Sequence, residues 1–176
     1  MNVLDVAENS VAAGATLIEV DLRIYTGQKR MTLAIIDNGK GMSEETAAQV
    51  TDPFFTTRTT RKVGLGLPLF RLAAEQTGGR LSIESEVGKG TTVTAVFAAG
   101  SIDCPPLGDM AGTVALLCQG APEELELTYT RRTAAGEFRF DTRQVREILG
   151  PGIPLAEPEV AQFIREYVAE GEESVK

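Results

Sequence analysis

The sequence predicts an α+β fold: a two-layer α/β sandwich in which helices cover one face of a mixed β-sheet, followed by a small C-terminal α+β unit. Three observations predict it. Helical and strand-like hydrophobic periodicities alternate along the first hundred residues. Pairs of expected strands are separated by short glycine-containing turns, which is typical of hairpins. After residue 100 the composition shifts to a proline-containing connector, which marks a boundary between two units.

The first unit, residues 1–100, is expected to begin with a helix over residues 1–14. Apolar side chains recur there at helical spacing, and Gly14 is a residue type that commonly stops a helix. Residues 16–24 then alternate between apolar and polar side chains, which is typical of a strand. The other expected elements of this unit are a strand over 31–36, a short helix starting at Ser43, a helix over 67–76, and strands over 80–86 and 91–97.

The second unit, residues 101–176, starts at the connector that contains Cys104-Pro105-Pro106. Its acidic end, residues 170–176, is expected to be frayed. The last helix carries apolar residues on one face, and either packing inside the chain or contact with a partner or a second copy explains that face. The expected elements are strands over 112–119, 124–131 and 137–140 and helices over 142–149 and 157–169, the last with Val160, Phe163, Ile164 and Val168 on its apolar face.

Charge and hydrophobicity exclude several classes of partner. The formal net charge is −8 at pH 7 and no basic stripe compensates it, so we expect no nucleic-acid partner. The sequence has no apolar run of the roughly 18–20 residues that cross a membrane, and its start does not resemble a signal peptide. We therefore expect a cytoplasmic protein without a membrane partner.

Two residue types limit the available chemistry. The cysteines, Cys104 and Cys118, are too few and too far apart for a zinc cluster or a C-x-x-C redox pair, so both are expected to be core thiols. The sequence contains no histidine. Histidine therefore cannot act in this chain as a general base, a metal ligand or a phosphate acceptor.

The first candidate site lies on the N-terminal helix. Asp5 and Asn9 are four residues apart, so both project from one helix face. Asn9 can offer an amide oxygen to Mg²⁺, a hard ion that prefers oxygen ligands. Asp5 can accept a proton from, or orient, an attacking water or hydroxyl group. A capped and solvated surface helix is the alternative explanation.

The second candidate site is the segment Asp37-Asn38-Gly39-Lys40-Gly41-Met42, which follows a buried strand. The Asp37 carboxylate can accept a hydrogen bond from an exocyclic amine such as that of adenine. Gly39 and Gly41 would let a ring approach the main chain. A simple turn is the alternative explanation, because Asp-Asn-Gly is a common turn sequence.

The third candidate site is the segment Gly64-Leu65-Gly66-Leu67-Pro68, which precedes a helix. Backbone N–H groups and the positive end of the helix dipole would face an anion bound there. Arg58, Arg61 and Lys62 lie just upstream and can meet a γ-phosphate. A plain glycine turn beside a solvated basic run is the alternative explanation.

Taken in order, these segments resemble the ATP-binding motifs of the GHKL superfamily, and above all its histidine-kinase-like branch. The helix resembles the N box, and its Glu8-Asn9-Ser10 form is especially similar to that of MutL-type mismatch-repair proteins. The resemblance covers residues 1–98. The other matching motifs are Asp37 to Met42 for the G1 box, Asp52-Pro53-Phe54-Phe55-Thr56-Thr57 for the F box, Gly64 to Leu67 for the G2 box, and Gly88-Lys89-Gly90-Thr91 for the last strand of the adenine site.

The resemblance implies a Bergerat ATP-binding fold with ATP and Mg²⁺ as ligands. It implies that Asn9 binds Mg²⁺, that Asp37 binds the adenine amine, and that Thr91 supports the Asp37 contact. A short lid, roughly residues 54–63, would close over the phosphates, with Phe54 and Phe55 as its hydrophobic anchors. The implied nucleotide-binding residues are Asn9, Asp37, Gly39, Gly41, Met42, Arg61, Lys62, Gly64, Leu65, Gly66, Leu67 and Thr91, and Asp5 is the implied catalytic group.

The sequence departs from the family in two respects. Asp5 stands where many members have glutamate or asparagine, and its shorter arm puts ATP hydrolysis in doubt. The dimerisation helices and the phosphoacceptor histidine of a sensor kinase are missing, so autophosphorylation on histidine is impossible here. The layout resembles small stand-alone bacterial kinases of the anti-sigma type. Relatives have more helix before the N box. The question whether the natural chain starts further upstream is therefore open.

We therefore expect an ATP- and Mg²⁺-binding protein that is an ATPase, or a protein kinase acting in trans on a partner protein in signalling. The alternative is a regulatory module whose lid reports the nucleotide state to a partner without turnover. A homodimer stays open. A mismatch-repair-like clamp is disfavoured by the length, the acidity and the kinase-type lid.

Overall fold

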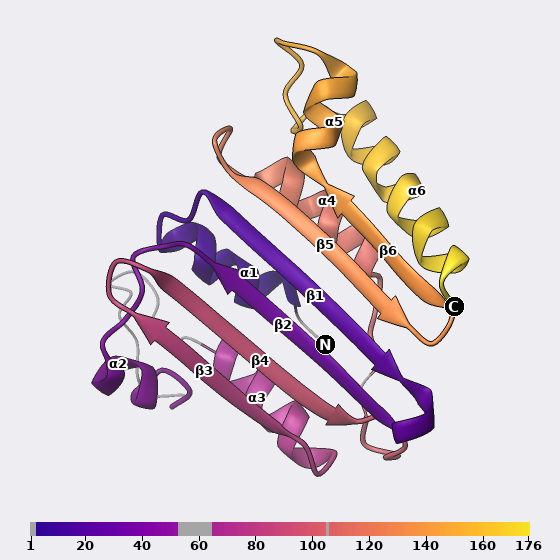
Figure 1. The fold of residues 1–176 in the computed structure, drawn as a ribbon. Helices are drawn as coiled ribbons and strands as arrows, with labels where there is room; N and C mark the ends of the chain where they lie inside the picture. Colours follow the sequence, from indigo (N-terminus) through magenta and orange to yellow (C-terminus); the bar gives the residue numbers. More distant parts are fainter. Residues whose placement is uncertain (1–2, 53–64, 105) are drawn as a thin grey trace.

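The computed structural model describes residues 3–52, 65–104 and 106–176, which form a six-stranded mixed sheet with helices packed behind it (Figure 1). The strands are β1 (Leu17–Tyr25), β2 (Arg30–Asp37), β3 (Arg80–Glu86), β4 (Gly90–Ala98), β5 (Glu126–Thr133) and β6 (Gly136–Asp141). The helices are α1 (Val3–Ala12), α2 (Glu44–Gln49), α3 (Gly66–Gln76), α4 (Met110–Gly120), α5 (Thr142–Leu149) and α6 (Pro158–Ser174), with a 3-10 turn, η1 (Thr26–Gln28).

The sheet has the strand order β3-β4-β2-β1-β5-β6. Neighbouring strands pair antiparallel except β1 and β5, which run parallel. Figure 1 shows α1, α3 and α4 behind the sheet, with α6 beside α4. The predicted fold class, an α+β sandwich with a mixed sheet, is therefore confirmed.

The core lies between this sheet and the helices, because the strands alternate between buried and partly exposed side chains. On β1, Ile18, Val20 and Leu22 are buried, and the residues between them face the open side. One of these, Asp21, is ion-paired on that side with Arg132 of β5 at 2.6 Å. The buried side chains that the other strands add to this core are Leu33 and Ile35 of β2, Val93, Ala95 and Phe97 of β4, and Leu127 and Tyr129 of β5.

The segment after residue 100 extends this same sheet. β5 pairs with β1 in a register that sets Leu17 opposite Glu126, and β6 follows as the edge strand. The connection between β4 and β5 contains α4, which is consistent with the need for a long crossover between parallel strands. The division at residue 100 stays a prediction.

The predicted strand over residues 112–119 is wrong, because this segment forms helix α4. The segment is apolar almost throughout, and periodicity alone cannot tell a short buried helix from a buried strand. The overlooked signal was Asp109, whose side chain accepts a hydrogen bond from the Gly112 N–H at 2.7 Å and caps the helix. An all-round apolar helix is expected to be buried, and six of the eleven residues of α4 are buried, with α6 packed against the helix.

The expectation of a frayed C-terminus is also wrong, because α6 continues to Ser174 and Val175 is buried. The end of α6 is held by Glu172, which is ion-paired with Arg131 at 3.1 Å and accepts a hydrogen bond from the Tyr129 hydroxyl. Burial, and then the contact with Glu172, raise the pKa of Tyr129. Three of the four residues on the predicted apolar face, Val160, Ile164 and Val168, are buried, so packing inside the chain explains most of that face.

The two cysteines differ in their surroundings. Cys118 is buried in the core as expected, and burial raises the pKa of its thiol to about 12. Cys104 is only half-buried, in the connector before α4. Within the described ranges, no helix has the length and apolar character of a membrane span.

We predict that Glu172→Ala lowers the free energy of unfolding by about 2–3 kcal/mol. The side chains of Arg131 and Glu172 are only 11% and 14% exposed, so the substitution leaves a largely buried guanidinium without its carboxylate. Urea unfolding measures the change. The control is Glu173→Ala, which removes an exposed ion pair to Lys176 and should change stability by less than about 0.5 kcal/mol. Equal losses in the two variants would show that Glu172 does not hold the end of α6.

Candidate functional site

Helix α1 joins two groups of residues that the sequence predicted to share one site. Near its start, Asp5 is exposed, and Asn9, about one turn further along, is half-buried. The beginning of α3 lies against Asp5, since a Cβ placed on Gly66 would be 3.4 Å from the Asp5 Cβ. Near its end, Ala13 accepts a hydrogen bond at its carbonyl oxygen from the Lys40 N–H at 3.0 Å. At about 1.5 Å per residue, the positions of Asp5 and Ala13 are about 12 Å apart along the helix axis.

The Asp37 carboxylate is held from two sides at the end of β2. Its Oδ2 accepts a hydrogen bond from the Ser10 hydroxyl at 2.6 Å. Its Oδ1 accepts one from the Gly39 N–H at 2.9 Å. A carboxylate has about four acceptor positions on its two oxygens, so acceptor capacity remains for a ligand. The side chain is half-buried, which leaves it within reach of one.

Thr91 lies directly across from Asp37 in the pairing of β2 with β4. Its hydroxyl contacts the Ser85 hydroxyl at 2.8 Å. Ser85 in turn donates to the Gly90 carbonyl oxygen at 3.0 Å and accepts from the Met42 N–H at 2.8 Å. Thr91 and Ser85 therefore fix the loop after β2 through its backbone at Met42.

The glycines of the predicted site allow close packing of backbone against backbone. Gly41 has φ +65°, and a Cβ there would lie 1.9 Å from the Glu86 carbonyl oxygen. Gly90 has φ +119°, and a Cβ there would lie 1.9 Å from the Asp37 carbonyl oxygen. A Cβ on Gly39 would lie 2.9 Å from the Ala13 Cβ. The expected approach of a ligand ring to Gly39 and Gly41 stays a prediction, since internal packing already requires glycine at both positions.

Asn38 anchors the loop to the start of β1. Its Oδ1 accepts hydrogen bonds from the N–H groups of Thr16 and Leu17, both at 2.9 Å. Its Nδ2 donates to the Thr16 hydroxyl at 2.9 Å. The loop that carries Asp37 is thus tied to β1, to α1 and to the turn between β3 and β4.

Sequence reasoning missed the roles of Ser10, Asn38 and Ser85. Ser10 left a signal, because it continues the stripe of buried positions Val3, Val6 and Ala7 on α1 and is the polar member of that stripe. A polar side chain at a buried position needs a hydrogen-bond partner, and here the partner is Asp37. The contacts of Ser85 connect segments 43 residues apart in the sequence, so local patterns could not reveal them.

The start of α3 supplies the third part of the predicted site. Leu65 occupies the N-cap position and has no side-chain oxygen to cap the first turn, so this turn can present backbone N–H groups to an anion. Leu65 is exposed and Leu67 is buried, while Pro68 sits in the first turn as expected. The predicted contributions of Arg58, Arg61, Lys62 and Gly64, and of the lid over 54–63 with Phe54 and Phe55, lie outside the described residues.

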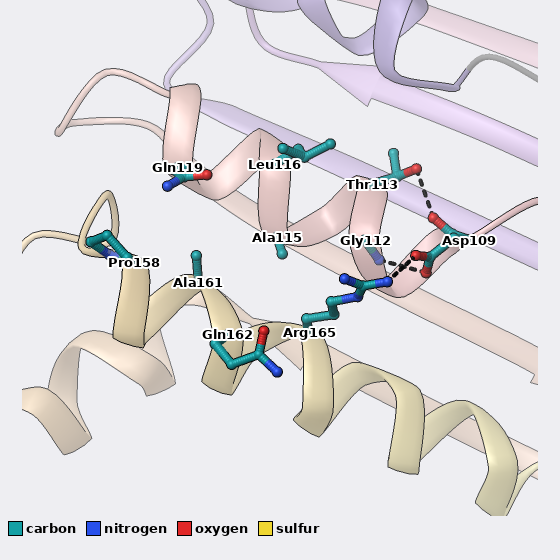
Figure 2. Close-up of a pocket in the computed structure, with 10 residues that line it drawn as sticks. All are labelled: Asp109, Gly112, Thr113, Ala115, Leu116, Gln119, Pro158, Ala161, Gln162 and Arg165. Carbon is teal, nitrogen blue, oxygen red and sulfur yellow. Dashed lines mark hydrogen bonds and ion pairs between the residues drawn. The ribbon is translucent and has the colours of Figure 1, made fainter.

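A cavity of about 480 Å³ lies elsewhere, between α4 and α6 (Figure 2). Asp109 and Arg165 meet across it at 2.9 Å and satisfy each other's charge. The remaining lining is made of small, apolar and amide side chains, such as Ala115, Leu116 and Gln119. The groups suited to nucleotide chemistry therefore lie at α1 and the loop after β2, and not in this cavity.

The described residues fit ATP and Mg²⁺ in their chemistry. Asp37 has a fixed carboxylate for an amine, and α3 has an uncapped start for phosphate oxygens. Asn9 offers one amide oxygen from the helix that joins these two places. Mg²⁺ on a nucleotide is held mainly by phosphate oxygens and water, with one or two protein ligands. Across the described ranges there is no group of three or more Asp, Glu or Cys residues that would hold a metal ion alone.

Residues 2–100 match the family described as histidine kinase-, DNA gyrase B- and HSP90-like ATPases. The sensor histidine kinase AruS of Pseudomonas aeruginosa is 28% identical over 166 residues, which is 88% of this chain and 16% of AruS. Sporulation kinase D of Bacillus subtilis is 32% identical over 92 residues, which is 52% of this chain and 18% of that kinase. This chain thus spans less than a fifth of the length of these two relatives.

The crystal structure of the N-terminal domain of a DNA repair protein has the same fold, with a TM-score of 0.54 at 14% identity. The match covers 84% of this chain and 55% of that one. The matched 84% of this chain is longer than the segment matched by the family, which ends at residue 100. The shared fold therefore includes part of the segment with α4, β5 and β6.

We predict that Gly90→Ala destabilises the protein by at least about 3 kcal/mol, because a methyl group 1.9 Å from the Asp37 carbonyl oxygen forces the backbone to move. The matched control is Gly88→Ala in the same turn. Gly88 also has a positive φ, +80°, but there is open space around its Cβ position. Gly88→Ala should therefore lower the free energy of unfolding by only about 1–2 kcal/mol. Thermal unfolding of both variants separates the steric clash from the cost of the backbone conformation, and similar losses would contradict the prediction.

Proposed function

Because the chain belongs to the family of histidine kinase-, DNA gyrase B- and HSP90-like ATPases, we propose that it binds ATP with Mg²⁺ and is an ATPase or a protein kinase acting in trans on a partner protein in signalling. The family and the histidine-kinase relatives support ATP binding in a kinase-like domain. The observation that carries the proposal is the geometry of α1, which joins the fixed carboxylate of Asp37 to the uncapped start of α3.

At the base end of the proposed site, Asp37 accepts a hydrogen bond from the adenine amine. Its orientation is already set by Ser10 and Gly39, so binding requires little rearrangement of the side chain. The loop that carries Asp37 is fixed by backbone packing at Gly41 and Gly90. Thr91 supports Asp37 from the neighbouring strand, through the contacts of Ser85 with the loop.

At the phosphate end, the first turn of α3 faces the phosphate oxygens with its N–H groups and its dipole. Gly64, Arg61 and Lys62 complete this end of the site in the proposal, with the two basic side chains meeting the γ-phosphate. Asn9 holds Mg²⁺, which neutralises charge on the phosphates.

Asp5 is the proposed catalytic group. It lies next to Gly66, at the end of α1 where the phosphates would be. It orients the attacking water, or the hydroxyl of an acceptor, and accepts its proton as the new bond to phosphorus forms and ADP leaves. None of the 176 residues is a histidine, so no histidine among them can be the acceptor, and we propose that the phosphoryl group goes to water or to a residue of a partner protein. We place this reaction in the cytoplasm, where ATP and Mg²⁺ are supplied.

Residues 101–176 are the second unit of the proposed division, and we assign to them the contact with a partner protein or a second copy. Most of the apolar face of α6 is occupied inside the chain, but Phe163 and Tyr167 remain 44% and 43% exposed. Their rings stack with centroids 6.0 Å apart. Such exposed aromatic side chains are enriched at protein interfaces.

The first test is calorimetric titration with ATP and Mg²⁺, beside a phosphate-release assay on the same sample. We expect Asp37→Asn to weaken ATP binding at least about tenfold, because a hydrogen bond to a charged acceptor contributes about 1.5–3 kcal/mol. The control is Asp103→Asn, an exposed position in the connector after β4. The last residue of β4, Ala98, pairs with Arg30 at the start of β2, which is the end of β2 opposite to Asp37. Failure of the wild-type chain to bind ATP would overturn the proposal.

We also predict that Asp5→Asn slows phosphate release about 100-fold or more while ATP binds with unchanged affinity. Asp103→Asn again serves as the control for loss of a single carboxylate. Turnover that survives in the Asp5 variant would remove Asp5 from its proposed role. Binding without release in the wild-type chain would favour the regulatory alternative, in which the nucleotide state is reported to a partner without turnover.

A further inference from the structure

We propose that Ser10 is a positioning residue that makes the site selective for a purine bearing an exocyclic amine over one bearing an oxo group. Ser10 acts through Asp37, whose carboxylate it holds in one orientation. The inference rests on the proposed function, because it assigns a selectivity to the same nucleotide site. Its physical basis is the contact between a buried hydroxyl of α1 and the carboxylate at the end of β2.

The surroundings of Ser10 leave its hydroxyl few alternatives. The residue is 4% exposed, and it belongs to the same buried stripe as Val6 and Ala7. A buried hydroxyl without a partner costs free energy. The hydroxyl donates to Asp37 Oδ2 at 2.6 Å, a short distance typical of a hydrogen bond to a charged oxygen. The contact spans 27 residues of sequence, so helix α1 itself positions the carboxylate.

The two donors together fix the side chain of Asp37. Ser10 binds Oδ2 and the Gly39 N–H binds Oδ1, so rotation of the carboxylate would break at least one of these hydrogen bonds. Without the Ser10 hydroxyl, Oδ2 of Asp37 would lose its donor within the protein. The carboxylate could then rotate while it keeps only the hydrogen bond from the Gly39 N–H to Oδ1. The direction in which the remaining acceptor positions point is therefore set by Ser10.

A fixed carboxylate discriminates between the groups that a purine can carry at its six-position. It accepts a hydrogen bond from an amine but repels the lone pairs of an oxo group, because an ionised carboxylate is an acceptor only. Sites built around one polar contact reject an analogue that cannot make it more strongly than apolar sites do. Once the carboxylate can rotate, the contact with the amine weakens, while a ligand without the amine loses nothing.

A merely structural role for Ser10 predicts a different result. If Ser10 only stabilised α1 or the loop after β2, its loss would weaken every nucleotide to the same extent. The ratio of the affinities for ATP and ITP, which differ at the six-position of the base, therefore separates the two roles.

The test compares wild type, Ser10→Ala and the control Ser82→Ala, an exposed position on β3, by calorimetry with ATP and with ITP in the presence of Mg²⁺. We expect Ser10→Ala to raise the Kd for ATP about tenfold, equivalent to about 1.4 kcal/mol, and to leave the Kd for ITP within about twofold. The ATP-over-ITP preference then falls about tenfold. The control variant should keep the wild-type preference.

A second readout needs no nucleotide. Hydrogen exchange of the Gly39 amide should accelerate in Ser10→Ala, because the carboxylate that accepts from this amide is no longer held on its other side. Unchanged Gly39 exchange would overturn the positioning role. Equal weakening of ATP and ITP would overturn the selectivity role while the proposed function stands. If the wild-type chain bound neither nucleotide, the proposed function would fail and the selectivity with it.

Discussion

The carboxylate of Asp37 joins the helical layer to the sheet at the point where the candidate site is built. It accepts hydrogen bonds from Ser10 on α1 and from Gly39 in its own loop. The backbone carbonyl oxygen of Asp37 packs against Gly90 at the start of β4. Three segments far apart in the sequence are thus brought together around one residue. The cost of burying part of a charge is offset by these donors, which also prevent the side chain from rotating.

The geometry of α1 follows from the same contact. Its buried stripe packs on the sheet, and its last turn is fixed through Ser10 and Ala13 to the loop after β2. With that end fixed, the other end meets Gly66 at the start of α3. The positions of Asp5 and Asn9 relative to Asp37 are therefore determined by one rigid helix. A site that must hold both the base and the phosphates of one ligand benefits from such rigidity, because misplacement by about 1 Å weakens catalysis.

Much of the fold of the first hundred residues could be predicted from sequence, because these residues combine clear periodicity with motifs that are local in the chain. Asp37 and Asn9 are predicted as site residues because their sequence neighbours carry the signal. The contacts of Ser85 were not, since they depend on strand pairing between distant segments. Helix α4 was predicted as a strand because its burial on several sides removes the helical pattern. The end of α6 was predicted to fray because its acidic residues look solvated, yet Glu172 finds Arg131 and Tyr129 only in the folded chain.

The start of β1 links the candidate site to the segment after residue 100. Thr16 donates its N–H to the Asn38 side chain in the loop after β2, and its carbonyl oxygen accepts from the Glu126 N–H at the start of β5. Glu126 accepts a hydrogen bond from Thr142, the first residue of α5. Any movement of Asn38 must therefore be accommodated by a residue that also pairs with β5. Buried backbone groups need hydrogen-bond partners. The backbone of Thr16 supplies one to the loop that carries Asp37 and one to the start of β5, so both segments are fixed by the same residue.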